Sequence, residues 1–201
     1  MVRLAIVAFL ALCCHPGWSQ QDPAWARRVN DFWASQDARF KDPRSTPLPA
    51  EDLKTFKTID RYAPDARYRV TARFTSRQGP DFVMPTTGPK QPIYRSIGYL
   101  SFTVDGRTCR LNVYQNQDAL KDPRYADHLF VPFTDLSNGE STYGGGRYID
   151  LSGPLGASVE LDFNVAYNPL CAYGTGYSCP IPPKENHLKV PIHAGARYKG
   201  H

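Results

Sequence analysis

The sequence predicts a mainly β domain: an antiparallel barrel or sandwich built from hairpins, with one amphipathic helix packed on it. Several short segments alternate apolar and polar residues, which is the period-two pattern of strands with one buried face. Turn signals separate these segments, and no strand–helix–strand alternation occurs along the chain. The one long helical pattern precedes all of the predicted strands. This order favours a sheet of neighbouring hairpins over a parallel sheet with crossover helices.

Residues 1–19 have the pattern of a cleavable signal peptide. Residues 4–14 form an uncharged, mostly apolar run behind Arg3, and this run is shorter than the about 20 residues that a membrane-spanning helix needs. Cleavage is expected after Ser19. A lipoprotein signal ending at Cys13 is the alternative, but bulky Leu12 stands where such signals have a small residue. The sequence therefore favours a periplasmic or secreted protein without a stable membrane span.

Length and charge indicate one domain behind the signal peptide. We expect an amphipathic helix and linker over residues 20–50 and a β-rich domain over residues 51–198. The formal net charge is +5, but the basic residues are spread along the chain with acidic residues between them. Nucleic-acid-binding proteins gather positive charge into a patch or an arm. The sequence therefore predicts no nucleic-acid partner, and it leaves the oligomeric state open.

The amphipathic helix is predicted directly after the signal peptide. Asp22-Pro23 provides an N-cap followed by proline at the first helical position, and Asp42-Pro43 ends the helix. Its apolar residues recur at spacings of three, four and seven, so they form one stripe that should pack on the domain. The stripe consists of Trp25, Val29, Phe32, Trp33 and Phe40. A short helical turn is expected near residues 51–56.

Strands are predicted from residue 67 onward, separated by turns and loops. Residues 76–92 are rich in glycine, proline and threonine and are expected to be mainly loop. The predicted strands outside the central hairpin cover residues 67–74, 128–133, 147–151, 158–163 and 188–193. The strands at 147–151 and 158–163 follow one another closely, so we expect them to pair as a hairpin.

The strongest local prediction is a hairpin around Asp105-Gly106, because Asp-Gly between two alternating segments is typical of a two-residue turn. This turn places Val104 opposite Arg107, Phe102 opposite Cys109, Leu100 opposite Leu111, and Gly98 opposite Val113. Directly opposed residues share one face of a sheet, so the apolar members fall together. Cys109 is therefore expected in the core as a small apolar residue.

Three cysteines remain after signal cleavage, and two of them lie in a loop rich in proline and glycine. A disulfide between Cys171 and Cys179 would stabilise this loop by about 2–3 kcal/mol in the loop-entropy model. Two unpaired thiols are the alternative. No second close pair of ligands completes a metal site with these cysteines, so no metal is predicted. We also expect no cofactor, because the chain contains no nucleotide-binding motif.

Two stretches resemble a known family. Residues 142–151 (TYGGGRYIDL) form the first, and residues 161–173 (LDFNVAYNPLCAY), followed by residues 178–186 (SCPIPPKEN), form the second. Together they resemble the bacterial DUF1684 family, which is defined by sequence and has no established activity. The resemblance extends from about residue 56 to residue 194. Val165 stands where family members often carry a basic residue. The resemblance thus implies membership of a group and no particular reaction.

The first candidate site is the glycine-rich segment before the 147–151 strand. Gly144, Gly145 and Gly146 allow a turn whose consecutive N–H groups bind an anion. Arg147 would add a bidentate positive charge. The sequence favours a plainer alternative, in which a flexible loop enters a strand and Arg147 pairs with a nearby acidic residue.

The second candidate site is a group of three carboxylates. If strands 147–151 and 158–163 pair, Asp150, Glu160 and Asp162 share one face. Such a cluster can supply a general acid and a general base, or bind a hard cation such as Ca²⁺. The alternative, which the sequence favours, is a solvated outer face where arginines balance the carboxylates.

The third candidate site is the loop over residues 164–186, whose aromatic and amide side chains suit a sugar or another small polar ligand. The same groups would equally well pack the loop on the barrel. The candidate ligand-binding residues of this loop are Asn164, Tyr167, Asn168 and Glu185.

Three functions are compatible with these features. The favoured one is a module that binds a small polar ligand or an anion where the 144–147 segment and the 164–186 loop meet. The second is a hydrolase-like enzyme that uses Asp150 and Asp162 with Glu185 or Arg147, although the sequence contains neither HExxH nor Gly-x-Ser-x-Gly. The third is a structural protein associated with the cell envelope.

Overall fold

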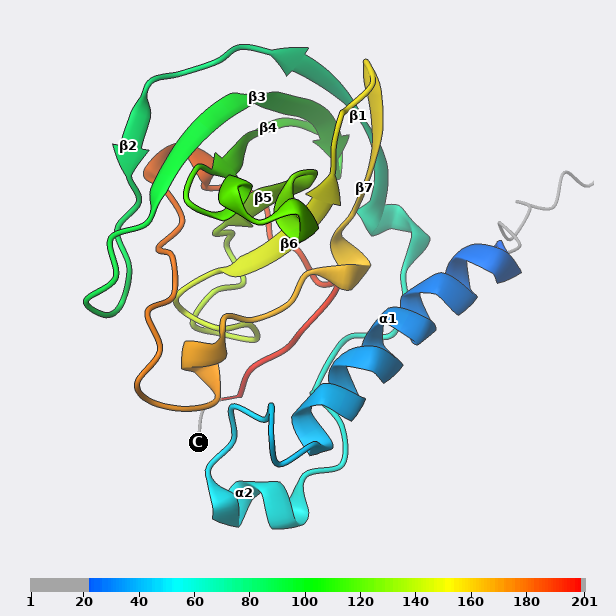
Figure 1. The fold of residues 1–201 in the computed structure, drawn as a ribbon. Coiled ribbons are helices and arrows are strands. Elements are labelled where there is room, and N and C mark those ends of the chain that lie inside the picture. Colours follow the sequence, from blue (N-terminus) through cyan, green and yellow to red (C-terminus); the bar gives the residue numbers. More distant parts are fainter. Residues whose placement is uncertain (1–21, 200–201) are drawn as a thin grey trace, which may run out of the picture.

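A computed structural model describes residues 22–199, and the predicted signal peptide lies outside this part of the chain. Figure 1 shows two N-terminal helices followed by a strongly curved sheet. The elements are α1 (Pro23–Lys41), α2 (Ala50–Thr55), β1 (Arg69–Ser76), β2 (Asp81–Val83), β3 (Ile93–Val104), β4 (Arg107–Asn116), β5 (His128–Phe133), β6 (Arg147–Ser152) and β7 (Ser158–Asp162), joined by loops and short 3₁₀ turns. Among residues 22–199, no helix is long and apolar enough to cross a membrane.

The strands form one antiparallel sheet that curls into a half-barrel, with α1 packed against it (Figure 1). The strand order is β6-β5-β4-β3-β1-β7. β2 lies inside the segment that was expected to be mainly loop, and it pairs with β3 beside this path. The largest apolar core draws residues from every strand of the path and from residues 188–194. The structure thus confirms a mainly β fold with a packed N-terminal helix.

The β3–β4 hairpin forms with the predicted register. Asp105 and Gly106 both have positive φ, 47° and 72°, as a two-residue turn of type I′ requires. All four predicted residue pairs are present. Cys109 is 8% exposed and belongs to the main core, and this burial raises the pKa of its thiol. The residue therefore packs as a small apolar group, as expected.

The α1 helix packs its aromatic stripe on the segment that follows β7. The Asp22 side chain accepts a hydrogen bond from the Ala24 N–H at 3.0 Å, which caps the helix as predicted. Trp33 is buried and donates its indole N–H to the Asn164 carbonyl at 2.8 Å. This contact holds the C-terminal half of α1 beside the chain that leaves the sheet.

The predicted hairpin between strands 147–151 and 158–163 is wrong. β6 pairs with β5, and β7 pairs with β1 on the opposite edge of the sheet. Both edges gain an apolar neighbour in this way, because Ile149 lies opposite Val131 and Leu161 lies opposite Val70. A short connection between two alternating segments fits either arrangement, so the pattern alone could not distinguish them.

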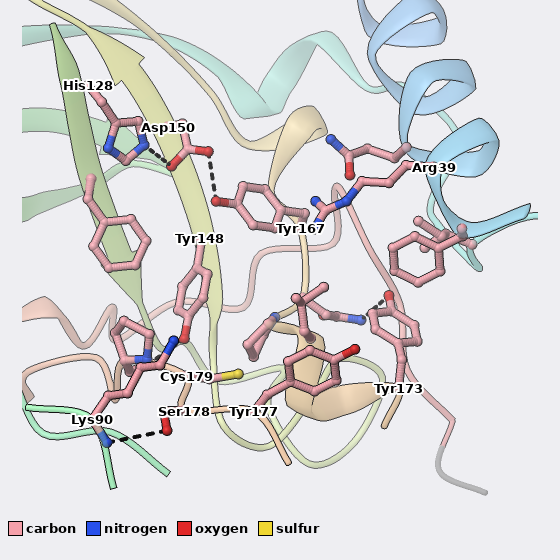
Figure 2. Close-up of a pocket in the computed structure, with 18 of the residues that line it drawn as sticks. Arg39, Lys90, His128, Tyr148, Asp150, Tyr167, Tyr173, Tyr177, Ser178 and Cys179 are labelled. Carbon is pink, nitrogen blue, oxygen red and sulfur yellow. Dashed lines mark hydrogen bonds and ion pairs between the residues drawn. The ribbon is translucent and has the colours of Figure 1, made fainter. Parts of the chain in front are cut away.

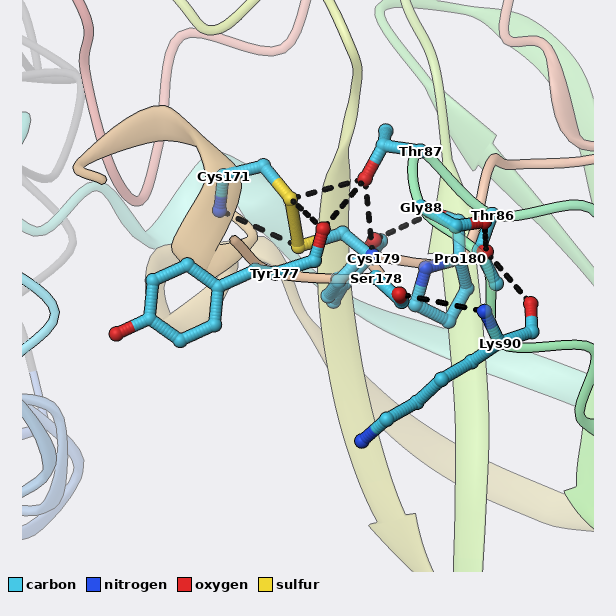
Figure 3. Close-up of a disulfide and its surroundings, with 10 residues drawn as sticks. Thr86, Thr87, Gly88, Lys90, Cys171, Tyr177, Ser178, Cys179 and Pro180 are labelled. Carbon is cyan, nitrogen blue, oxygen red and sulfur yellow. Dashed lines mark hydrogen bonds between the residues drawn. A yellow bond between two sulfur atoms is a disulfide. The ribbon is translucent and has the colours of Figure 1, made fainter. Parts of the chain in front are cut away.

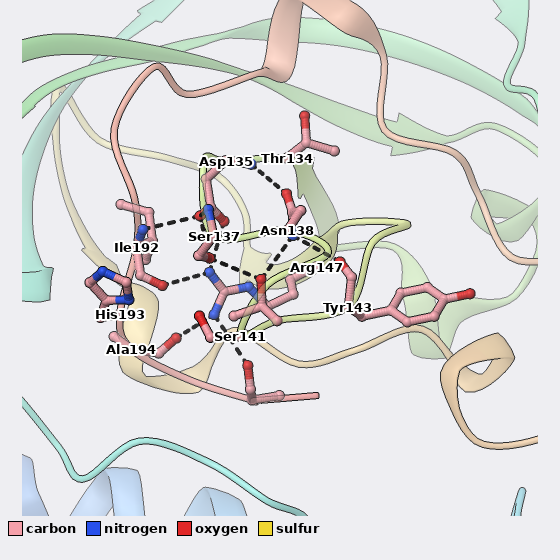
Figure 4. Close-up of polar contacts among 12 residues, drawn as sticks. Thr134, Asp135, Ser137, Asn138, Ser141, Tyr143, Arg147, Ile192, His193 and Ala194 are labelled. Carbon is pink, nitrogen blue, oxygen red and sulfur yellow. Dashed lines mark hydrogen bonds and ion pairs between the residues drawn. The ribbon is translucent and has the colours of Figure 1, made fainter. Parts of the chain in front are cut away.

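Residues 188–193 do not form the predicted strand, although buried and more exposed residues do alternate along this segment. Alternate side chains from Leu188 to Ala194 are buried in the core, but the segment forms no ladder with any strand of the described chain. Its backbone binds two side chains instead (Figure 4). The Ile192 N–H donates to Asp135 Oδ1 at 3.1 Å, and Arg147 Nη2 donates to the Ile192 carbonyl at 2.8 Å.

An ion pair between Arg147 and Asp135 lies at the centre of this arrangement. Arg147 Nη2 is 2.8 Å from Asp135 Oδ2, and both side chains are 0% exposed. Arg147 Nη1 also donates to the carbonyls of Ala194 and Ala196. Asp135 Oδ1 accepts from the Ser137 N–H at 2.8 Å. Buried charges are tolerated when they are paired and hydrogen-bonded in this way, and here the pair takes the place of a neighbouring strand.

Replacing Arg147 should therefore destabilise the whole domain. Arg147→Met is expected to lower the free energy of unfolding by about 3–5 kcal/mol, because it leaves the Asp135 carboxylate buried without its cation. Arg95→Met is the control: Arg95 and Asp81 are 37% and 46% exposed, so losing this pair should cost less than about 1 kcal/mol. Urea unfolding followed by circular dichroism measures both. An equally small loss for Arg147→Met would contradict the role given to the buried pair.

Candidate functional site

A pocket of about 430 Å³ lies between the end of α1, the face of β5 and β6 that points away from the main core, and the loop over residues 167–180 (Figure 2). This volume is within the range of small-molecule sites. Aromatic side chains form most of its walls, and charged or titratable groups enter from several elements. The aromatic residues are Trp33, Phe40, Tyr94, Phe130, Tyr148, Tyr167, Tyr173 and Tyr177, and the charged or titratable groups beside them include Arg39, Lys90, His128 and Asp150.

Strand alternation in β5 and β6 decides which residues reach the pocket. One face of this strand pair enters the main core, so the residues in between point to the other side. Tyr148 and Asp150 are two residues apart on β6 and share the pocket face. Asp150 lies directly opposite Phe130 on β5. His128, two residues before Phe130, is on the same face and reaches Asp150 diagonally.

His128, Asp150 and Tyr167 form a hydrogen-bonded group on this wall. His128 Nε2 lies 3.0 Å from Asp150 Oδ1, and the Tyr167 hydroxyl donates to Asp150 Oδ2 at 2.7 Å. The hydrogen bond that His128 donates to Asp150 raises the pKa of His128, and burial raises the pKa of Tyr167. Tyr167 therefore keeps its proton and acts as a donor. Both oxygens of the Asp150 carboxylate already have a partner within the protein.

Asn168 lines the pocket and carries an unpaired polar atom. The residue is 3% exposed, and its Nδ2 donates to the Tyr173 hydroxyl at 3.0 Å and to the Arg197 carbonyl at 3.1 Å. A carbonyl can only accept, so the second contact fixes the orientation of the amide. Asn168 Oδ1 is consequently a buried acceptor that has no partner in the described part of the chain. Such an atom is costly to bury unless a donor reaches it.

A disulfide restrains the loop that covers one side of the pocket. Cys171 and Cys179 are bonded, as predicted, with their Cα atoms 6.3 Å apart (Figure 3). Thr87 attaches this loop to residues 84–92: its N–H donates to the Cys179 carbonyl, and its hydroxyl accepts from the Cys179 N–H, both at 3.0 Å. Lys90 follows on the same segment, with its backbone N–H 3.4 Å from the Ser178 hydroxyl. These contacts bring Lys90 to the pocket.

The glycine-rich candidate segment lies outside the pocket. Gly144 and Gly145 are exposed, whereas Gly146 is buried with a φ of 88°. A Cβ on Gly146 would lie 2.6 Å from the Phe133 carbonyl oxygen, so glycine is needed here for close approach to β5. Arg147 is buried with Asp135 and is not available to a ligand in solvent. The structure thus contains the plainer alternative, and the anion site that required Arg147 does not form.

The candidate carboxylate cluster does not assemble, because its two strands lie at opposite edges of the sheet. Asp150 faces the pocket. Glu160 binds Arg69, with Arg69 Nε 2.7 Å from Glu160 Oε2, and Asp162 accepts the Trp25 indole N–H at 2.6 Å. Within residues 22–199, no group of three or more His, Cys, Asp or Glu side chains is placed to hold a metal ion.

Two further candidates, Asn164 and Glu185, also lie outside the pocket. Asn164 is buried, and its amide accepts from the Asp65 N–H at 2.8 Å and donates to the Asp65 carbonyl at 2.9 Å. It therefore anchors the chain that leads into β1. Glu185 is exposed and accepts from the Tyr114 hydroxyl at 3.3 Å. Of the predicted ligand-binding residues, Asp150, Tyr167 and Asn168 line the pocket.

Several polar groups of the pocket were not among the predicted residues, although the spacing of some of them in the sequence indicated their position. Tyr148 alternates with Asp150 on one strand, so period two places both on the same face. Arg39 follows Trp33 and Gln36 at successive spacings of three, which sets it beside the apolar stripe of the helix. Lys90 had no such signal, because contacts with the disulfide loop decide its position.

Fold and pocket together define a half-barrel domain whose aromatic cavity is bordered by a helix and a disulfide-bonded loop. The family described as "Protein of unknown function (DUF1684)" matches residues 54–197. The chain therefore belongs to the DUF1684 family, as its motifs indicated. It is also similar to an uncharacterised protein of Haloarcula marismortui, whose structure was solved in solution by NMR. The identity is 33% and the TM-score 0.69, over 87% of this chain and 94% of that chain. No curated protein matches the chain significantly.

Removing the disulfide should destabilise the protein measurably. The double variant Cys171→Ser, Cys179→Ser is expected to lose about 2–3 kcal/mol of unfolding free energy, because the unfolded chain regains the freedom of the loop. Chemical denaturation measures this loss, and peptide mapping without reductant detects the bond. Cys109→Ala is the control, because the Cys109 thiol forms no disulfide. Reductant should change the unfolding free energy of this variant as much as it changes that of the wild type. A double variant as stable as the wild type would refute the prediction.

The raised pKa of His128 predicts a pH dependence with a defined sign. Below the unfolded-state value of about 6.5, the contact with Asp150 contributes its full stability, and this contribution is lost as pH rises through the folded-state pKa. Asp150→Asn should therefore lower the His128 pKa and destabilise the protein more at about pH 5.5 than at about pH 9. The difference should stay below about 1 kcal/mol, because the side chains are 33% and 44% exposed.

NMR titration of the imidazole protons measures the His128 pKa. Asp52→Asn, at an exposed position of α2, removes a carboxylate outside the pocket and is the control. If the pKa of His128 is the same in the wild type and in Asp150→Asn, the contact with Asp150 is not the cause of the raised pKa.

Proposed function

We propose that this protein is an exported module that binds a small polar organic ligand in the pocket between α1, β5, β6 and the 167–180 loop. The observation that carries this proposal is the make-up of the cavity, with aromatic walls and polar groups that enter from separate segments. Ligand sites are typically concave and mostly apolar, with a few convergent polar groups. The sheet does not require this cavity, because its main core lies on the other face of β5 and β6.

The rigidity of the pocket walls supports the same proposal. The rings of Tyr148 and Tyr167 meet edge to face, with centroids 5.7 Å apart, and those of Phe40 and Tyr173 do so at 4.8 Å. Contacts of this kind hold each ring in one orientation. A preformed pocket loses less conformational entropy when a ligand binds.

Export forms part of the proposal. The signal-peptide pattern of residues 1–19 supports it. The disulfide between Cys171 and Cys179 is also of a kind that persists in an oxidising compartment, such as the periplasm or the extracellular medium.

A hydrolase-like enzyme is a second candidate, which the contact between His128 and Asp150 favours. In many hydrolytic sites a carboxylate orients a histidine that acts as general base. Asp162, Glu185 and Arg147 lie outside the pocket, so this chemistry would depend on the histidine and its one carboxylate. Hydrolysis of a nitrophenyl ester that falls about 100-fold or more in His128→Gln would support this candidate over simple binding.

Filling the pocket should abolish ligand binding while the fold is kept. Gln36 is half-buried on α1 and lines the pocket, so Gln36→Trp places an indole in the cavity. Ser35→Trp adds the same ring at an exposed position of the same helix and is the matched control. The measurement is a thermal-shift screen of sugars, organic acids, amines and inorganic anions.

A compound present at about 100 times its Kd should stabilise the wild type and Ser35→Trp by about 2.7 kcal/mol. Gln36→Trp should show no such stabilisation. The proposal fails if no class of compound stabilises the wild type, or if Gln36→Trp responds as the wild type does.

A further inference from the structure

On the basis of the proposed ligand-binding function, we infer that the ligand is a ring-bearing organic anion. The cations at the pocket select its charge, and the aromatic walls select its ring. Each feature is an independent property of the same cavity.

The free charge at the pocket is positive. Arg39 is exposed on the last turn of α1, Lys90 is exposed on the 84–92 segment, and neither side chain forms an ion pair in the described part of the chain. Figure 2 shows Arg39 on the helix side of the pocket and Lys90 on the side of the disulfide loop. An anionic group can therefore approach either cation without displacing a carboxylate. Guanidinium and ammonium groups that reach an anion in this way form strong, charge-assisted hydrogen bonds.

A cationic ligand is disfavoured by the same geometry. Aromatic pockets bind ammonium groups best when a carboxylate is free to face the cation. Asp150 is the carboxylate among the described residues that line this pocket, and its two oxygens are bound by His128 and Tyr167. Arg39 from α1 and Lys90 from the loop would repel a cation.

The pocket walls suit a ring. Tyr148, Tyr167, Tyr173 and Tyr177 line the cavity together with Trp33, and they come from β6, the 167–180 loop and α1. Aromatic side chains offer flat faces on which an aromatic or sugar ring can stack, and their hydroxyls supply polar edges. A volume of about 430 Å³ accommodates one ring with its substituents.

Two matched series of probes test this inference by isothermal titration calorimetry. The aromatic series contains 4-hydroxybenzoate, its neutral amide 4-hydroxybenzamide, and the cation tyramine. The sugar series contains glucose 6-phosphate and glucose. We expect 4-hydroxybenzoate or glucose 6-phosphate to bind about tenfold more tightly than its neutral counterpart. The series that meets this expectation identifies the ring.

Charge variants connect the binding to the two cations. Arg39→Gln and Lys90→Gln should each weaken binding of the anionic probe by about threefold to tenfold, with little effect on the neutral probe. Lys41→Gln is the control, because Lys41 is exposed on the same helix and lies outside the pocket. If Arg39→Gln and Lys90→Gln bind the anionic probe as tightly as Lys41→Gln does, the inference is overturned.

Failure of the inference can be distinguished from failure of the proposed function. If neutral or cationic probes bind as tightly as the anions, and Gln36→Trp abolishes that binding, the ligand class is wrong and the binding module stands. If neither the two series nor the thermal-shift screen yields a ligand, the proposed function fails, and this inference fails with it.

Discussion

The buried ion pair between Arg147 and Asp135 is the interaction on which the rest of the structure depends. The sheet ends at β6 on one side and β7 on the other, so its apolar interior needs a cover from outside the ladder. Residues 188–196 provide this cover without becoming a strand, and their buried backbone groups must find partners elsewhere. Arg147 donates to three of their carbonyls, and Asp135 accepts the Ile192 N–H. The guanidinium suits this task because its donors form a rigid planar fork.

The strand β6, which carries Arg147, separates the core from the pocket. Arg147 faces the core from β6, and strand alternation then turns Tyr148 and Asp150 to the other side. The helix α1 and the disulfide loop border that second face and leave a cavity between them (Figure 2). Cations on the two sides of β6 therefore have different surroundings. The core-facing arginine is buried and paired, whereas Arg39 and Lys90 at the pocket remain exposed and without an ion pair.

The predictions that succeeded rest on residues that are close in sequence. The Asp105-Gly106 turn determined the whole register of its hairpin, because each later pair follows from the first. The cap at Asp22 and the aromatic stripe of α1 were likewise visible in the local pattern. The two-residue period of a strand predicted that Asp150 points to the side opposite Ile149. Asp150 is accordingly one of the predicted residues that line the pocket.

The sequence by itself determined the mainly β fold, the packed helix, the turn of the central hairpin, and the cysteines close enough to form a disulfide. These properties depend on backbone preferences and on periodicities of two and 3.6 residues, which are local. The tertiary structure alone decided that β6 pairs with β5, that Arg147 binds the carbonyls of the C-terminal segment, and that Lys90 and Tyr148 line one cavity. These contacts join residues far apart in the chain, and the apolar faces and buried charges select them only when the whole sheet has formed.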